Sequence, residues 1–242
     1  MNRSIDGDIV YIAELDQDVD DVIAAEYLYK KKALRCVVLD PIPKERAGID
    51  RKNELIKMGI LVTSRIPEDT TRIFSGGALT RVAGFIKDHK LEYLIMNGGF
   101  VGYNLADDIL DKFKNKLECR TFNFNCDVEA TDQVLKSPNI ENIMLIGKNV
   151  CHNRRNTPAG IWRAESELFK KYGVNDTKLQ HDMLACHEGL VELGYIKEDK
   201  YLLYSKVEPY NTGLNGIHTL WGSKIPSGFG EYRTVTAAIG WK

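Results

Sequence analysis

The stretch that decides the fold is DIVYIAELDQDVDD, residues 8–21. Its first half is an apolar run with the length of a buried strand, and the residues from Val19 onward have the apolar spacing of a helix. Five carboxylates lie within eight residues at this junction, at positions 14, 16, 18, 20 and 21. Because neighbouring negative charges repel one another, something must compensate them. The segment predicts a strand that delivers a group of acids to the start of a helix.

The same alternation of strands and helices continues along the chain. We expect strands at residues 8–14, 35–39, 60–64, 93–96 and 142–146, and helices at residues 19–31, 54–58, 79–90, 128–136, 161–172 and 182–193. Residues 201–204 and 232–239 are expected to be extended. Nearly continuous apolar strands separated by helices indicate a Rossmann-like α/β fold, a mainly parallel sheet with helices on both faces. No repeat or Gly/Ser linker interrupts the pattern, so residues 1–242 are expected to form a single domain.

Composition argues against several classes of function. The net charge is −1 at pH 7, so we expect no overall attraction to nucleic acid or to an anionic membrane. No apolar run approaches the roughly 20 residues that cross a bilayer, and the acidic N-terminal segment is unlike a signal peptide, so a cytoplasmic protein is expected. Five scattered cysteines without a CxxC pair fit reduced thiols. Cys151 and His152 could form a nucleophilic pair, but sequence neighbours seldom meet in the required geometry.

The acidic cluster has two interpretations. A helix N-terminus stabilises each negative charge by only about 0.3–1 kcal/mol, which is little for so many carboxylates. Converging carboxylates therefore suggest a hard cation, and calcium suits a site built from carboxylates, a backbone carbonyl, water and sugar hydroxyls. The spacing is not that of an EF-hand. The alternative is an acidic helix cap that faces water, which is a common feature of soluble proteins.

Two protein families share features of this segment. A strand ending in DxD, here residues 16–18, resembles the nucleophile motif of haloacid dehalogenase-type phosphatases. A strand ending in DxDxxxDD resembles the signature of the inosine–uridine nucleoside hydrolases, and residues 14–21 are similar to it with Glu14 in place of the first Asp. Later segments resemble the second family in its own order: GALT (77–80), MNGGF (96–100), GYN (102–104), TFN (121–123), DVEA (127–130) and the pair His181-Asp182. The second resemblance is therefore favoured.

This resemblance implies the nucleoside hydrolase fold and a calcium-dependent N-glycosidase that splits a nucleoside or a nucleoside derivative into base and sugar. It places calcium on Asp16, Asp21, Asp182 and the backbone carbonyl of Thr80. Asp16 would accept a proton from the attacking water, and His181 would protonate the leaving base. The sugar would be bound by Asp20, Asn104, Phe122 and Asn123. A homo-oligomer, either a dimer or a tetramer, is also implied. The simpler interpretation of His181 is a helix cap or a side chain packed beside Tyr172.

Several positions depart from the pattern of that family. Thr121 replaces a Glu that usually contacts the 5′-hydroxyl, and the Asn expected after the second strand has no counterpart. The segment between residues 66 and 76 is short, which predicts an open pocket. We therefore hypothesise a larger or 5′-phosphorylated substrate, whose phosphate would meet basic residues. The candidates are Lys44, Arg120, Arg154 and Arg155, and the alternative is that they form solvated surface.

Two rival functions stay open at this point. A non-catalytic nucleotide- or ribose-binding module on the same fold would bind ribose with calcium and release no base. A haloacid dehalogenase-type phosphatase would use Asp16 as nucleophile and Asp18 as acid, together with magnesium, and would release phosphate from simple esters. The phosphatase interpretation leaves the His181-Asp182 pair without a role.

Overall fold

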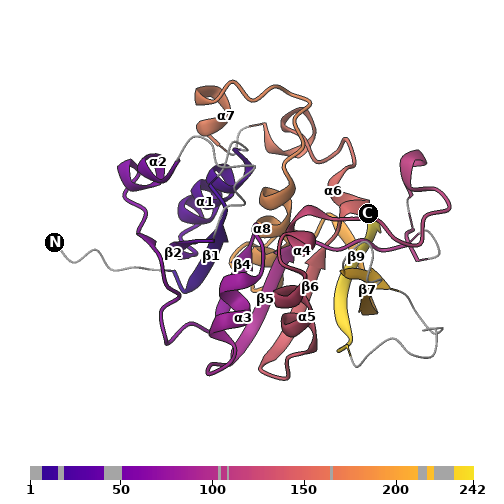
Figure 1. The fold of residues 1–242 in the computed structure, drawn as a ribbon. Coiled ribbons are helices and arrows are strands. Elements are labelled where there is room, and N and C mark those ends of the chain that lie inside the picture. Colours follow the sequence, from indigo (N-terminus) through magenta and orange to yellow (C-terminus); the bar gives the residue numbers. More distant parts are fainter. Residues whose placement is uncertain are drawn as a thin grey trace.

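A mainly parallel sheet forms the centre of the molecule in the computed structural model (Figure 1), which describes residues 7–15, 19–40, 51–102, 105–107, 109–163, 166–211, 217–220 and 232–242. Within these residues the sheet has nine strands in the order β3-β2-β1-β4-β5-β6-β9-β7-β8. Neighbouring strands from β3 to β9 run parallel, whereas β7 is antiparallel to both β9 and β8. The predicted fold class is confirmed.

The first strand and helix lie where the opening sequence places them. Strand β1 (Ile9–Ala13) is fully buried, and helix α1 (Asp20–Lys30) follows it after a short connection. The alternate residues Ile9, Tyr11 and Ala13 join one hydrophobic cluster, while Val10 and Ile12 join the other. Because successive side chains of a strand point to opposite faces, a strand with apolar residues at every position needs a cover on both sides.

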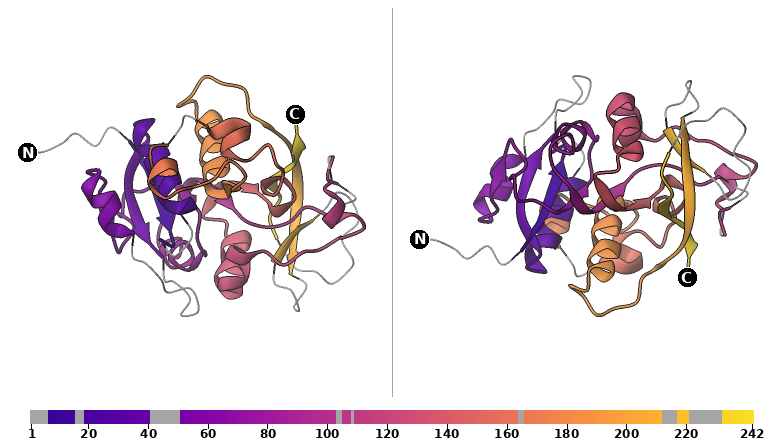
Figure 2. Two further views of the ribbon diagram at one scale, coloured as in Figure 1. Left: turned by 90° about the horizontal axis from the view of Figure 1, so that it is seen from above. Right: turned by 90° about the horizontal axis from the view of Figure 1, so that it is seen from below.

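Helices supply that cover on both faces (Figure 2). Helix α1 packs with α8 (His181–Glu192) on one face, and α8 also contacts β4, β5 and β6. On the other face α3 (Thr80–Phe85) packs with α5 (Val128–Lys136). Shorter helices complete the layers: α2 (Lys52–Lys57), α4 (Phe122–Cys126), α6 (Lys148–Cys151) and α7 (Leu168–Lys171). None of the helices in the described residues is both long and apolar enough to cross a bilayer.

The remaining strands agree with the sequence in most places. Strands β2 (Leu34–Leu39), β3 (Val62–Thr63), β5 (Leu91–Asn97) and β6 (Ile140–Ile146) lie within or around the predicted segments. The extended C-terminal segments are β7 (Leu202–Asn211), β8 (Ile217–Leu220) and β9 (Val235–Trp241). Strand β9 pairs in parallel with β6, and the antiparallel strands β7 and β8 extend the sheet beyond it.

One central strand is missing from the prediction. Strand β4 (Arg72–Ser75) lies between β1 and β5, in a segment that the sequence analysis treated only as a short connection over the pocket. It has four residues and begins with an arginine whose guanidinium pairs with Asp8 and Glu92. Because the strand is short and begins with a charged residue, a search for apolar runs does not detect it.

Two predicted helices are shorter than expected. The segment 161–172 is not one helix: a π-helical turn, η3 (Pro158–Trp162), is followed by the separate α7. The Thr157 hydroxyl accepts from the Gly160 amide and starts the turn early, and the Leu168 amide is held by the Ser166 hydroxyl at 3.1 Å. Side-chain oxygens that bond the nearby backbone compete with continuous helix. Helix α3 likewise ends at Phe85, well before residue 90.

The order of the strands fixes where a ligand can bind. The chain runs outward from β1 to β2 and β3, then returns to β4 on the other side of β1. In open parallel sheets the crevice at such a reversal, beyond the carboxyl ends of the strands, is the usual ligand site. Glu14 follows β1 and Gly76 follows β4, so both residues lie at this reversal.

Candidate functional site

A pocket of about 280 Å³ opens at the carboxyl ends of β1, β4, β5 and β6. Its walls come from segments far apart in the sequence: Glu14, Asp20, Asp21, Gly76, Asn97, Gly98, Gly99, Thr121, Phe122, Asn123, Lys148, Cys151, His152, His181 and Asp182. Six of the residues expected to bind metal or substrate, or to act in catalysis, are among them: Asp20, Asp21, Phe122, Asn123, His181 and Asp182. Asp16 and Asn104 lie outside the described residues.

Three carboxylates, which we call the acidic floor, come from two helix starts: Asp20 and Asp21 in the first turn of α1, and Asp182 in the first turn of α8. All three are buried, with at most 6% of each residue exposed. A helix N-terminus favours negative charge, which lowers the cost of burying these groups. The packing of α1 against α8 brings the two helix starts together.

Each carboxylate of the acidic floor is held by a donor from another element. The Tyr11 hydroxyl donates to Asp21 Oδ1 at 2.7 Å, and the Asn97 amide donates to Asp182 Oδ1 at 2.8 Å. Burial, followed by the charges of Asp21 and Asp182, raises the pKa of Tyr11, so its phenol stays protonated and remains a donor. The Asp20 carboxylate accepts the His181 backbone amide at 3.2 Å. Hydrogen bonds to charged groups are strong, so the floor is held rigidly.

Gly76 marks the point where two of these carboxylates converge. A Cβ atom added to Gly76 would lie 2.5 Å from Asp21 Oδ1 and 2.9 Å from the Asp182 carboxyl carbon. Both distances are too short for a real side chain, so only glycine fits between the two acids. The absence of a side chain leaves the Gly76 backbone beside two negative groups. Two converging carboxylates suit a small hard cation, which prefers oxygen ligands.

The expected metal ligands can be compared with this geometry. Asp21 and Asp182 are brought together, whereas Thr80 is not among the pocket residues; its hydroxyl donates to Asp127 Oδ2 at 2.8 Å. Within the described part of the chain, no three His, Cys, Asp or Glu side chains are placed to hold a metal ion. Asp21 and Asp182 can supply two ligands of a cation site, and such a site needs further ligands, for which the sequence offers Asp16.

Two residues of the expected sugar site lie on or beside α4. The Asn123 amide donates to the carbonyls of Gly76 at 2.6 Å and Asn97 at 2.8 Å, so it ties together the chain just after β4 and the end of β5. Phe122 is 44% exposed and lies at the pocket surface. Asn123 therefore shapes the pocket by holding its backbone, and Phe122 offers an apolar ring to a ligand.

His181 lines the pocket at the first position of α8. Its ring centroid is 5.0 Å from that of His152, which also lines the pocket and which the sequence offered as a possible partner of Cys151. The Cys151 thiol is buried and donates to Asn97 Oδ1 at 3.5 Å, and burial raises its pKa well above the usual value. A thiol of this kind stays protonated, which argues against a nucleophilic cysteine.

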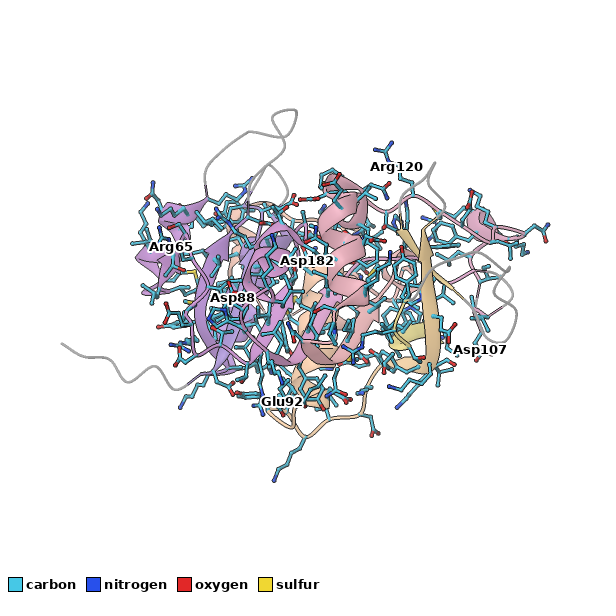
Figure 3. The ribbon with its side chains drawn as sticks, turned by 60° about the horizontal axis from the view of Figure 1, so that its bottom comes forward. Arg65, Asp88, Glu92, Asp107, Arg120 and Asp182 are labelled. Carbon is cyan, nitrogen blue, oxygen red and sulfur yellow. The ribbon has the colours of Figure 1, made fainter. Side chains whose placement is uncertain are left out.

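The basic residues expected to meet a phosphate lie elsewhere. Arg120 is exposed, and its side chain projects away from the body of the protein (Figure 3). Arg155 donates to the Lys242 carbonyl and Arg154 is exposed, while Lys44 lies outside the described residues. The basic side chain that does line the pocket is Lys148, at the first position of α6. The sequence analysis did not name Lys148 as a candidate, although it follows a predicted strand closely.

No protein-family model matches the chain. A curated protein of Aquifex aeolicus (strain VF5), described as uncharacterized, is 28% identical over 167 residues; the match covers 63% of this chain and 54% of that protein, so the matched part spans about half of its length.

Solved structures give a clearer result. An inosine-uridine preferring nucleoside hydrolase from Bacillus anthracis superposes with a TM-score of 0.55 over 97% of this chain and 94% of its own, at 14% identity. This chain has the nucleoside hydrolase fold. An inosine-guanosine nucleoside hydrolase gives a TM-score of 0.54 at 12% identity, covering 96% of this chain and 94% of the other. At these identities the likeness shows the nucleoside hydrolase fold alone.

Proposed function

We propose that the protein hydrolyses the N-glycosidic bond of a nucleoside or a nucleoside derivative, releasing a base and a sugar. The observation that carries this proposal is the convergence of Asp21 and Asp182 on Gly76, in a pocket that also contains His181. The two similar structures are those of nucleoside hydrolases, which supports the same reaction class. The bond to be broken needs negative charge near the sugar and a proton donor near the base, and the pocket offers both.

We further propose that the acidic floor holds a calcium ion through Asp21, Asp182 and Asp16. The backbone carbonyl of Thr80 is kept as the further ligand that the resemblance implies, since the Gly76 carbonyl already accepts from the Asn123 amide at 2.6 Å. When bound, the ion would lower the pKa of a coordinated water and fix the hydroxyls of the sugar. A cation bound between Asp21 and Asp182 would also offset the electrostatic repulsion between these two carboxylates.

The proposed roles of the protein groups combine the family resemblance with the positions of the described residues. Asp16 accepts the proton of the attacking water, and the buried carboxylates of the acidic floor stabilise positive charge that develops on the sugar ring. Asp20, Asn123, Phe122 and Asn104 bind or shape the sugar site. His181 donates a proton to the departing base, and its backbone is fixed for this by the hydrogen bond to Asp20. A histidine suits the task because its ordinary pKa is close to neutral pH.

A screen of nucleosides and nucleoside 5′-monophosphates, read out as reducing-sugar release with calcium and with chelator, tests the proposal. We expect release of sugar from at least one compound, and its loss with chelator. Binding of ribose with no release of base from any compound would instead identify a non-catalytic binding module. Release of inorganic phosphate with magnesium would identify a phosphatase and would contradict the proposal.

A further inference from the structure

A group of basic side chains lies on the side of the pocket formed by α6 and the segment around η2 (Asp111–Phe113). We call Lys112, Lys148 and His152 the basic rim. Lys148 and His152 line the pocket directly, at the start and just past the end of α6. Lys112 reaches the rim from η2, and its Nζ atom lies 2.7 Å from His152 Nδ1. None of these residues has a role in the hydrolysis proposed above.

The contact between Lys112 and His152 fixes the state of the imidazole. A lysine ammonium carries three donors and no acceptor, so Nδ1 of His152 must accept. The ring proton then resides on Nε2, and the imidazole is neutral. The surroundings agree: burial, followed by the charges of His181, Lys112 and Lys148, lowers the pKa of His152 to about 3. His152 is therefore a neutral ring with one fixed N–H donor.

The two lysines carry positive charge that no carboxylate of the described residues pairs with. Across the described ranges, neither Lys112 nor Lys148 has a carboxylate within ion-pair distance. The Lys148 ammonium donates to the Arg120 carbonyl at 2.9 Å, which orients it without neutralising it. Burial, followed by the charge of Lys148, lowers the pKa of Lys112. The repulsion between these two cations costs free energy that a bound anion would recover.

The basic rim and the acidic floor give one pocket two regions of opposite charge. We propose that the basic rim binds a phosphate group carried by the primary hydroxyl of the sugar, so that the substrate is a phosphorylated ribosyl compound. The chemistry of the sugar supports this position. If the acidic floor takes the diol and His181 faces the base, the 5′ carbon is the remaining end of the ribose. Two ammonium groups and one imidazole N–H match the three terminal oxygens of a phosphate dianion.

This inference rests on the proposed function for its substrate, but its test can be made by binding alone. Titration calorimetry with ribose and with ribose 5-phosphate measures how much the phosphate group adds to binding, and no bond is cleaved. We expect ribose 5-phosphate to bind at least about 30-fold more tightly than ribose, since each charge-assisted hydrogen bond contributes roughly tenfold or more. Equal binding of the two sugars would overturn the inference.

Matched variants show which residues bind the phosphate. Lys148→Gln and Lys112→Gln should each weaken ribose 5-phosphate by about tenfold and leave ribose unchanged. Lys87→Gln is the control, because Lys87 is exposed after α3 and outside the pocket. Because Lys148 and Lys112 have exposed or half-exposed side chains, their variants should fold, which thermal unfolding can check. The same loss in the Lys87 variant, or no loss in either rim variant, would contradict the role of the rim.

Activity separates the two proposals. If nucleosides are hydrolysed but a 5′-phosphate brings no gain in kcat/KM, the rim inference fails and the hydrolase proposal stands. If ribose 5-phosphate binds through the rim but no glycosidic bond is cleaved, the hydrolase proposal fails and the rim inference stands. We expect Lys148→Gln to lower kcat/KM for a nucleoside 5′-monophosphate by about tenfold or more, and to change that for the nucleoside by less than about twofold.

Discussion

The acidic floor and the basic rim lie in one pocket and are built in opposite ways. The floor comes from the first turns of α1 and α8, the two longest helices among the described residues, and its carboxylates receive hydrogen bonds from Tyr11, Asn97 and the His181 amide. The rim comes from the short α6 and the segment at η2, and its lysines have a carbonyl and an imidazole as neighbours. The floor is held before any ligand arrives, whereas the rim leaves its charge for the ligand to neutralise.

Removing a charge from the floor should have the largest effect. We expect Asp21→Asn and Asp182→Asn each to lower kcat/KM by about 10²–10³-fold, because the groups that stabilise charge in a buried site are lost. Asp88→Asn removes an exposed acid from the turn after α3 and should leave activity unchanged (Figure 3). Steady-state hydrolysis at saturating calcium measures all three. Activity within about threefold of the wild type in both floor variants would show that the floor does not act in the reaction.

Adding one methyl group at Gly76 should lower activity far more than adding one at a glycine outside the pocket. We expect Gly76→Ala to lower hydrolysis by at least about tenfold, because its Cβ would push Asp21 and Asp182 apart. Gly84→Ala is the matched control, since nothing lies within 4 Å of its Cβ position in α3. That variant should keep full activity and gain about 0.5–1 kcal/mol in unfolding free energy, because alanine favours a helix. Equal activity of the two variants would mean that the Gly76 geometry is unimportant.

A smaller effect should come from a buried acid outside the floor. Asp40 ends β2 beside Glu14, and burial, followed by the charge of Glu14, raises its pKa to about 7 from 3.8. The folded state therefore binds this proton more tightly than the unfolded state, and the stability that it contributes at low pH is lost as the pH rises from about 4 through about 7. Asparagine does not ionise, so Asp40→Asn should keep this stability at high pH. We expect the variant to be more stable than the wild type by roughly 1–3 kcal/mol at pH 8.

Unfolding free energies from urea titrations between pH 4 and pH 8.5 would measure that difference. It should grow with pH and level off above the folded pKa of Asp40. Asp88→Asn, which removes an exposed acid, is the control. A difference for Asp40→Asn that does not change with pH would show that the Asp40 carboxyl is not perturbed by its burial.

Sequence patterns predicted most of the fold because apolar spacing reports which faces are buried. Strand β1 and helices α1, α5 and α8 were found within a few residues, since each carries its burial pattern in its own sequence. Strand β4 was missed because it is short and begins with a charged residue. Segment 161–172 was read as one helix because local bonds from Thr157 and Ser166, which decide its break, leave no periodic signal.

The site could be predicted only where a motif names its residues. Asp21, Asp182 and His181 came from such motifs, and the structure places all three in the pocket. Thr80 came from the same source, and its position beside Asp127 depends on how α3 follows β4. Lys112 belongs to no motif, and it reaches His152 only because η2 lies beside the end of α6. Charges that converge through tertiary structure are invisible to a single sequence.

The most direct test of the central claim is a calcium titration by calorimetry on the wild type, Asp21→Asn and Asp182→Asn. The claim is that two acids from distant helices hold one ion. We expect the wild type to bind one calcium ion, and each single variant to weaken that binding by at least about tenfold, because a charged ligand is lost in each. A wild type that binds no calcium, or variants that bind it as tightly as the wild type, would contradict the claim.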